Sequence, residues 1–311
     1  GPQQFGLLDP NVAAYPQGHV GTYGAGYFTG GGPATSIVER IDFANDASLI
    51  TKGPLANARV YQGGASSIDY GYIGGGNGPV SIVERIDYSN DNAIASVRGN
   101  LTFATSFLGA VGNENFGYFG GGDAGSNSSR VDRVDYGSDS TTALEKGPLT
   151  ATGRYIVAAG NKSYGYFATG GPGTKSIVAR LDYFSDTTAC VEKGPLTTAR
   201  SQFMGVGNEY FGYVAGAVPA NTIIDRIDYA SDTSTALAKG NLNTGKGRGS
   251  SGVGNQSYGY FGGGSPGSGN TSTVDRIDYA NDTTIATPKG PLSTTRQCTA
   301  GVSARTNALP I

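Results

Sequence analysis

Six copies of one motif follow one another along this chain. Each copy reads roughly aromatic-Gly-Tyr-Phe-Gly-Gly-Gly, then acid-Arg-Ile-Asp-Tyr, then Lys-Gly-Pro-Leu. The tyrosine of the first segment recurs every 45 to 48 residues, at Tyr27, Tyr72, Tyr118, Tyr166, Tyr213 and Tyr260. Periods of this length are typical of arrays built from one supersecondary unit. Residues that recur in every copy are expected to support the fold rather than a functional site. We therefore look for functional residues at the positions where the copies differ.

The third copy shows the content of one unit most clearly. Residues 107–111, 115–119, 130–136 and 141–145 have the apolar, aromatic or alternating pattern of short strands, and turn-forming residues separate them. Four short antiparallel strands per period are typical of a propeller blade, and six blades can close into a ring. No stretch shows the 3.6-residue apolar stripe of a helical repeat. The sequence therefore predicts an all-β fold, a six-bladed β-propeller with four-stranded antiparallel blades.

The two ends of the repeat array indicate how the ring closes. A seventh copy of the first-strand pattern, residues 298–302, follows the sixth repeat, while residues 18–21 stand at the equivalent place before the first. The C-terminal segment is more similar to the other first strands, so we expect it to complete the blade that contains Tyr27. Closure of this kind removes the last open sheet edge.

Domain organisation follows from this closure. We predict a single propeller over residues 18–311 and an N-terminal arm over residues 1–17. The first two residues, Gly1-Pro2, resemble the remnant that a tag-cleaving protease leaves. We therefore expect the natural N-terminus to lie elsewhere.

Composition and charge narrow the classes of partner. The chain of 311 residues holds 52 Gly, 19 Tyr and 12 Phe, which suits a turn-rich all-β protein. Its formal net charge is −2 and its isoelectric point is near 5.5, so we expect no nucleic-acid partner, because phosphate contacts demand clustered Lys and Arg. Apolar runs are too short to span a bilayer, so we also expect a soluble protein without membrane insertion.

Catalytic and metal chemistry find little support. The single histidine, His19, has no repeat equivalent, and the only cysteines, Cys190 and Cys298, fall at different repeat positions. We expect buried thiols rather than a disulfide, no metal, no cofactor and no catalytic residue. Hydrolysis by a pair of carboxylates stays open as an alternative, although no pair stands out from the repeat.

A cation and an acid recur two residues apart in the third strand of every copy. The pairs are Arg40/Asp42, Arg85/Asp87, Arg133/Asp135, Arg180/Asp182, Arg226/Asp228 and Arg276/Asp278. Residues two apart on a strand share a face. Since catalysis would require six identical sites, we predict structural ion pairs within and between blades. The acids one position earlier, such as Glu39, Glu84 and Asp132, are expected to face solvent.

A second acid recurs in the turn after the third strand. It is preceded by Asn or Ser and stands at Asp46, Asp91, Asp139, Asp186, Asp232 and Asp282. Calcium requires six to eight convergent oxygens, which one aspartate per turn does not supply. We predict Asx-type hairpin turns at these positions.

The repeat resembles a known family, the Kelch repeat. The glycine pair, spaced tyrosine and downstream arginine of Kelch blades match Gly121-Gly122, Tyr136 and Arg154, and analogous sets cover nearly the whole chain. Two departures are the absence of the usual Trp and the replacement of the triple glycine by residues 215–217, Ala-Gly-Ala. The near-identity of the copies is also similar to Kelch-like propellers of marine bacteriophage virion and tail-fibre proteins. This second resemblance implies a virion or extracellular location and a role in host recognition.

Length variation is concentrated between the second and third strands. From the glycine before the repeated tyrosine to the third-strand aspartate, the copies differ by up to three residues, and the inserted residues are small and polar. Loops on a rigid scaffold tolerate such change and carry function. Candidate ligand-binding residues in these loops are Thr35, Asn77, Asp123, Ser126, Asn127, Lys175, Asn221, Ser268 and Asn270.

A second candidate site consists of cations in the connections between blades. Antiparallel order places these connections on the same face as the variable loops. They carry Arg59, Arg154, Arg200, Lys246 and Arg296, with Thr105 interrupting the series. One interpretation is that each cation caps blade carbonyls, and the other is a ring of positive charge that binds an anion or an acidic saccharide at the centre.

These observations favour a non-enzymatic binding module. The expected partner is a host surface glycan or protein, or neighbouring virion proteins, recognised through the variable loops, with homo-oligomer formation as a further possibility. The alternatives are a structural or intracellular protein-interaction scaffold without a small ligand, and an enzyme that acts on polysaccharide. Fold analogy alone is weak support for function.

Overall fold

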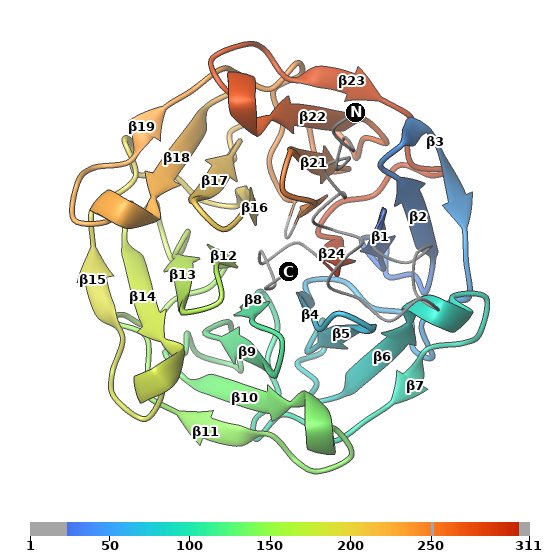
Figure 1. Cartoon of the computed structure of the whole chain (residues 1–311), viewed down its shortest axis with the longest axis vertical. Coiled ribbons are helices and arrows are strands. Elements are labelled where there is room, and N and C mark those ends of the chain that lie inside the picture. Colours follow the sequence, from blue (N-terminus) through green and yellow to red (C-terminus); the bar gives the residue numbers. More distant parts are fainter. Residues whose placement is uncertain (1–23, 250–251, 305–311) are drawn as a thin grey trace, which may run out of the picture.

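The structure is a computed structural model that describes residues 24–249 and 252–304. These residues form six four-stranded antiparallel sheets set around a central axis, which confirms the predicted six-bladed propeller (Figure 1). From the axis outward, blade 1 contains β24 (Ala300–Ser303), β1 (Ala25–Thr29), β2 (Val38–Asp42) and β3 (Asn45–Thr51). Blade 2 contains β4 (Gly63–Ser66), β5 (Tyr70–Gly74), β6 (Val83–Asp87) and β7 (Ser96–Val97), and blade 3 contains β8 (Gly109–Gly112), β9 (Phe116–Gly120), β10 (Val131–Asp135) and β11 (Leu144–Lys146).

The other three blades repeat this order. Blade 4 contains β12 (Val157–Gly160), β13 (Tyr164–Ala168), β14 (Val178–Asp182) and β15 (Val191–Lys193). Blade 5 contains β16 (Met204–Gly207), β17 (Phe211–Ala215), β18 (Ile224–Asp228) and β19 (Leu237–Ala238), and blade 6 contains β20 (Val253–Gly254), β21 (Tyr258–Gly262), β22 (Val274–Asp278) and β23 (Thr287–Lys289). The first two strands of each blade are buried and the fourth is largely exposed, so the cores lie near the axis and between blades.

The C-terminal strand closes the ring as predicted. Strand β24 pairs antiparallel with β1, with Val302 opposite Tyr27 and Ala300 opposite Thr29. A side-chain bond supports the same pairing, because the Thr29 hydroxyl donates to the Ala300 carbonyl at 3.0 Å. The first blade therefore combines both ends of the repeat array. The proposed N-terminal arm and His19 lie outside the described residues.

Five blades turn from the third to the fourth strand through a short 3₁₀ helix, and blade 1 does not. The helices are η1 (Tyr88–Asn90), η2 (Tyr136–Ser138), η3 (Tyr183–Ser185), η4 (Tyr229–Ser231) and η5 (Tyr279–Asn281). In blade 1, Asp42 pairs directly with Asn45 across a bulge in the register. The first repeat is one residue shorter here, which converts the 3₁₀ turn into a tight hairpin.

Aromatic stacking joins each blade to the next. The repeated second-strand tyrosine is buried and stacks on the aromatic residue that follows the third strand of the neighbouring blade, with ring centroids 4.6 to 5.4 Å apart. The stacked pairs are Tyr27–Tyr88, Tyr72–Tyr136, Tyr118–Tyr183, Tyr166–Tyr229, Tyr213–Tyr279 and Tyr260–Phe43. Such pairs stabilise by about 0.5–1.5 kcal/mol beyond area burial. The most regular residue of the repeat is thus an interface residue.

The turn aspartate of each blade binds three side chains of the preceding blade. Asp91 accepts hydrogen bonds from the Tyr27 hydroxyl at 2.7 Å and from Arg40 at 2.8 Å, and its other oxygen lies 3.1 Å from Lys52 Nζ. The same arrangement recurs around the ring, and Asp46 of blade 1 receives Tyr260 of blade 6 at 2.8 Å. We call these six sites the inter-blade carboxylates.

This arrangement corrects two predictions about the recurring acids. Five of the six third-strand arginines pair with an inter-blade carboxylate alone; only Arg40 also binds the aspartate of its own strand, Asp42, at 2.9 Å. The third-strand aspartates cap the 3₁₀ helices instead, as when Asp87 accepts from the Ser89 amide at 2.9 Å. The turn aspartates therefore link blades rather than forming local Asx turns. Ion pairing between blades is confirmed, but the partners are 51 to 56 residues apart in five pairs and 230 residues apart where blade 6 meets blade 1.

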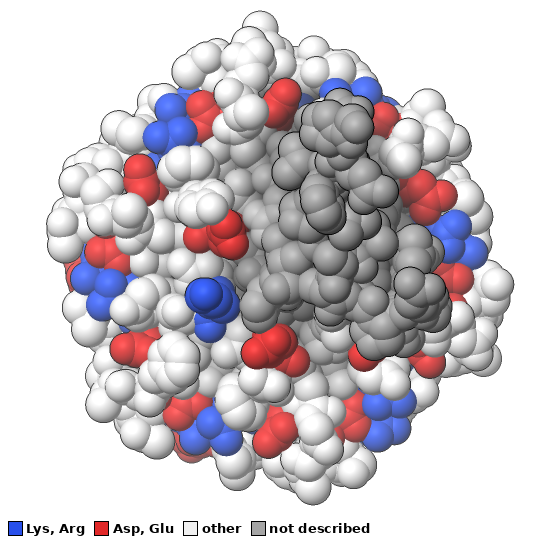
Figure 2. Space-filling model, in the orientation of Figure 1, with Lys and Arg blue, Asp and Glu red and all other residues white. Residues whose placement is uncertain are grey.

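Charges of opposite sign lie together on the visible rim as well as between the blades (Figure 2). Figure 2 shows that basic and acidic side chains lie next to one another around the rim of one face, and neither sign gathers into a patch there.

Cys190 and Cys298 are both buried free thiols, as expected. Within the described residues, no helix has the length and apolar content needed to cross a bilayer.

The inter-blade carboxylates predict acid sensitivity. Burial alone would raise the pKa of Asp91, but hydrogen bonds from Tyr27, Lys52 and Arg40 outweigh it and lower the pKa below the ordinary value. The pKa is lowered in the same way at Asp46, Asp139, Asp186 and Asp232. A lowered folded-state pKa means that the unfolded chain binds more protons at low pH. We therefore expect the free energy of unfolding to fall as the pH drops below the unfolded value of about 3.9.

Urea unfolding midpoints measured between pH 7 and pH 2.5 check this prediction. The midpoint should be steady above about pH 5 and then decline. An Asp139→Asn variant should show a weaker decline, since one of the linked groups no longer titrates. A midpoint that stays constant from pH 5 to pH 2.5 would contradict the prediction.

Candidate functional site

Each blade enters its first strand through a residue in the left-handed backbone conformation. These residues, which we call the axial ring, are Tyr61 (φ 65°), Phe107 (60°), Tyr155 (54°), Gln202 (58°), Arg248 (53°) and Cys298 (55°). A left-handed backbone costs a non-glycine residue roughly 1–2 kcal/mol. Backbone strain of this kind clusters at functional sites, where the surrounding structure holds it in place.

Backbone hydrogen bonds from blade to blade hold the axial ring. The Phe107 amide donates to the Tyr61 carbonyl at 2.8 Å, and the Tyr61 amide donates to the Cys298 carbonyl at 3.4 Å. On the other side, the Cys298 amide donates to the Arg248 carbonyl and the Arg248 amide donates to the Gln202 carbonyl, both at 2.6 Å. In the left-handed conformation, these peptide groups point toward the neighbouring blade and hydrogen-bond to it. The side chains of the axial ring lie around its centre.

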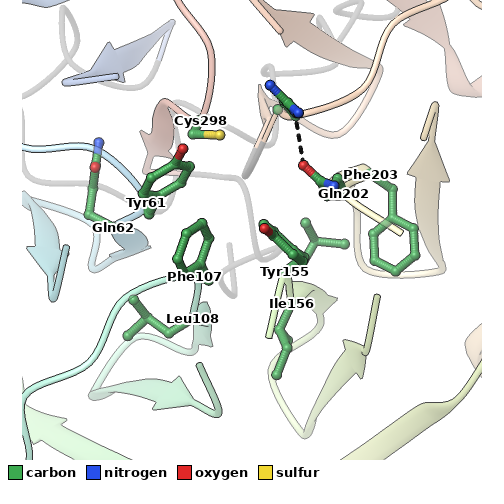
Figure 3. A pocket seen from close by; sticks show the side chains of 12 residues that line it. Tyr61, Gln62, Phe107, Leu108, Tyr155, Ile156, Gln202, Phe203 and Cys298 are labelled. Carbon is green, nitrogen blue, oxygen red and sulfur yellow. Dashed lines mark hydrogen bonds between the residues drawn. The ribbon is translucent and has the colours of Figure 1, made fainter. Parts of the chain in front are cut away.

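The axial ring surrounds a pocket at the propeller axis. The pocket encloses about 310 Å³, including the part open to solvent, and is lined by the axial ring together with the residues that follow it, such as Leu108 and Ile156. Figure 3 shows the side chains of Tyr61, Phe107 and Tyr155 gathered around one space. Little of this space lies inside the pocket, so the surface that a ligand could contact is the mouth of the pocket.

One half of the ring is aromatic. The Tyr61 and Phe107 ring centroids lie 3.9 Å apart, and Phe107 meets Tyr155 edge-on at 4.7 Å. All three side chains are half-buried, so each retains an accessible surface. Blades 2, 3 and 4 therefore present a continuous aromatic arc at the mouth of the pocket.

The other half of the ring is polar. Arg248 is exposed and donates from Nε to Gln202 Oε1 at 3.1 Å, the dashed line in Figure 3. Burial raises the pKa of the Cys298 thiol, although the Arg248 charge opposes this. Burial also raises the pKa of Tyr61, so both groups are neutral at physiological pH and Arg248 carries the charge of the ring.

Four of the five cations predicted as a ligand-binding ring are buried in ion pairs. Arg59 binds Glu84 at 2.6 Å, Arg200 binds Asp225 at 2.7 Å, Lys246 lies 3.6 Å from Asp275, and Arg296 binds Glu39. All four also donate to blade carbonyls, as when Arg59 donates to the Gly75 carbonyl at 3.0 Å. These contacts match the interpretation in which the cations cap blade carbonyls, and the four side chains offer no open ring of charge.

The same contacts overturn the expectation that the third-strand acids face solvent. Glu39, Glu84 and Asp132 are at most 1% exposed. In blade 3, where Thr105 replaces the cation, Asp132 is bound by the backbone amide and hydroxyl of Thr102 at 2.5 and 2.7 Å. The acids are buried because the connection from the preceding blade folds over them.

Arg154 stands one residue later in its repeat than the other predicted cations do in theirs. The structural equivalent of Arg59 in blade 4 is Gly153, since both pair with the strand two–three loop of the preceding blade. Blade 4 lacks the buried acid too and has Ala179 there. Arg154 instead binds Asp123 at 3.0 Å and lies over the Tyr155 ring at 5.3 Å. It therefore joins a predicted loop residue to the axial ring.

The predicted loop residues surround the axial ring on the same face. Isolated bridges join Thr35 to Arg59 and Lys175 to Arg200, two residues before the corresponding axial residues. Asn77, Ser126 and Ser268 are exposed, whereas Thr35, Asp123, Asn127, Lys175, Asn221 and Asn270 are half-buried. Some support the loops themselves, as when Asn270 donates to the Gly32 carbonyl at 2.8 Å. Ligand binding by these loops stays a prediction.

Sequence reasoning missed the axial ring. Its signal was present, because the position between the inter-blade connection and the first strand holds Tyr, Phe, Tyr, Gln, Arg and Cys in otherwise similar copies. The copies vary in side-chain chemistry at this position but not in length, so a comparison of loop lengths does not reveal it. The one-residue misplacement of Arg154 hid the pattern further.

No protein-family model matches this chain, and no curated protein sequence matches it either. The geometry of the axial ring and of the loops around it is therefore the basis for a proposed function.

Proposed function

We propose that this chain is a non-enzymatic binding module that recognises a host surface glycan or protein through the face carrying the axial ring and the strand two–three loops. The observation that carries the proposal is the axial ring itself. Six blades keep the same left-handed backbone there and vary the side chain, which is how a rigid scaffold supports a site.

The setting of this module is proposed from sequence resemblance. The Gly-Gly, Tyr and Arg pattern is similar to Kelch repeats, and the near-identical copies are similar to phage virion propellers. We accordingly propose a surface appendage such as a tail fibre as the parent assembly, outside the cell.

A scaffold role is the second candidate, favoured by apolar side chains on the outer strands. Ile94, Val97 and Ile50 of blades 1 and 2 are exposed on the rim. Such residues suit contact with a second copy or a neighbouring virion protein. If the chain is a scaffold, we expect sedimentation velocity to show a stable oligomer. We then also expect Asp123→Ala and Lys175→Ala to have no effect on function.

Removal of one aromatic side chain from the axial ring tests binding at this face. We expect Tyr155→Ala to weaken adsorption to susceptible cells or to their purified polysaccharide by at least about tenfold, because aromatic anchors dominate binding energy. Tyr210→Ala is the matched control, since Tyr210 is exposed on the hairpin between the first two strands, at the opposite face.

Equal loss in both variants, or no loss in Tyr155→Ala, would contradict the proposed face. Circular dichroism and urea midpoints of the two variants should match those of the unaltered protein. Depolymerisation of the polysaccharide, abolished by one carboxylate substitution, would instead support an enzyme.

A further inference from the structure

Resting on the proposed function, we infer that the axial ring binds a saccharide that carries a carboxylate, with Arg248 as the carboxylate contact and the aromatic arc as the platform for the sugar ring. The two halves of the axial ring differ in chemistry, and each suits one part of such a ligand.

Arg248 is distinguished by its partners. Among the residues that the structure describes, it is the only arginine without an ion pair to a carboxylate. Its contact with Gln202 uses Nε and fixes the plane of the guanidinium, while the two terminal nitrogens make no hydrogen bond with the described residues. A planar guanidinium binds a carboxylate through two parallel hydrogen bonds.

Among the described residues, no acid lines the pocket around Arg248. The described side chains that surround Arg248 there are aromatic, aliphatic, amide or thiol in character. The buried third-strand acids beneath the inter-blade connections are already paired, as Asp225 is with Arg200 and Glu84 is with Arg59. An anionic ligand would therefore meet one uncompensated positive charge.

The aromatic arc favours a ring-shaped partner over an extended acidic peptide. Tyr61, Phe107 and Tyr155 present apolar faces and two hydroxyls, which complement the mixed C–H and hydroxyl surface of a sugar. The pocket below the arc is too narrow to admit a sugar ring, so the ring would lie across its mouth, against the arc and beside Arg248.

The test compares methyl glucuronide with methyl glucoside, which differ only at C6, where the first has a carboxylate and the second a hydroxymethyl group. Titrations of the ¹⁵N-labelled chain, followed by NMR at the arginine Nε resonances, give both dissociation constants. We expect the glucuronide to bind about tenfold more tightly, as befits a charge-assisted contact. Arg248→Gln should abolish this preference, Arg248→Lys should retain part of it, and the control Lys162→Gln should leave it unchanged. Lys162 is likewise exposed and lies at the opposite face, so the two glutamine variants lose the same charge.

The outcomes separate this inference from the proposed function. Equal affinity for the two sugars, lost for both in Tyr155→Ala, would overturn the acidic-ligand inference and leave the binding module intact. Tighter binding of a glutamate-rich peptide than of the glucuronide, competing at Arg248, would overturn it in favour of a protein ligand. Binding of neither sugar would overturn it as well, and adsorption to cells would then decide the proposed function by itself.

Discussion

Replacing Arg59 by methionine is expected to lower the free energy of unfolding by about 3–5 kcal/mol, the largest effect predicted for a single side chain here. Arg59 and Glu84 are 3% and 0% exposed, and their closest atoms are 2.6 Å apart. Methionine would leave the Glu84 carboxylate buried with only the Ala56 and Asn57 donors. Removal of one member of a buried pair costs far more than the pair is worth. Urea unfolding followed by circular dichroism measures the change.

A double-mutant cycle provides the control. Glu84→Ala combined with Arg59→Met should cost clearly less than the sum of the two single variants, by about 1–3 kcal/mol. The chain supplies a natural precedent, because blade 4 lacks both the cation and the acid at these positions and has Gly153 and Ala179. Additive single and double variants would show that the two side chains act independently, contrary to this account.

The second large effect is expected at an inter-blade carboxylate. Asp139 is 5% exposed and accepts from Tyr72 and Arg85 at 2.8 Å and from Arg98 Nε at 2.9 Å. Asp139→Ala would leave one hydroxyl and two guanidinium groups of blade 2 without this acceptor. We expect a loss of about 3 kcal/mol, because the arginines are partly exposed and regain some hydration. Thermal and urea unfolding measure the loss.

Asp135→Ala is the matched control for this variant. Asp135 stands four residues earlier and caps the same helix, η2, by accepting from the Gly137 amide at 3.0 Å. Loss of a cap alone should cost about 1 kcal/mol. If Asp139→Ala cost no more than Asp135→Ala, the link between blades would contribute nothing beyond local capping.

The strands and the closure could be predicted because they depend on local pattern. The alternation of apolar and charged residues over 131–135 predicts a strand. The recurrence of the tyrosine at position 118 gives the period of the repeat. Even closure was visible, since residues 298–302 match the first strands of other blades. The wrong predictions concern contacts between copies. The sequence suggests that Asp87 forms the ion pair and Asp91 the local turn, whereas Asp87 forms the local cap and Asp91 the ion pair. The spacing within one copy could not show this, because the partner of Arg40 is 51 residues away in the next blade.

The candidate site was predicted only in part. The face was identified from the variable loops, and the bridge between Thr35 and Arg59 places loops and connections together. The burial of Arg59, Arg200, Lys246 and Arg296 could not be predicted, because their acid partners lie on the face of the third strand that was expected to meet solvent. The axial ring was missed because left-handed conformation leaves no mark on Tyr, Phe or Gln as it does on Gly.

The number of blades, the strands within each blade and the end that completes the ring follow from the repeat period and from side-chain alternation along one copy. Which copy of each charged residue pairs with which, and which six residues meet at the axis, can be read only from the folded ring. Identical repeats offer every blade the same partners, and only closure into a ring brings the next blade's aspartate to Arg40 and gathers Tyr61, Phe107, Tyr155, Gln202, Arg248 and Cys298 around one pocket.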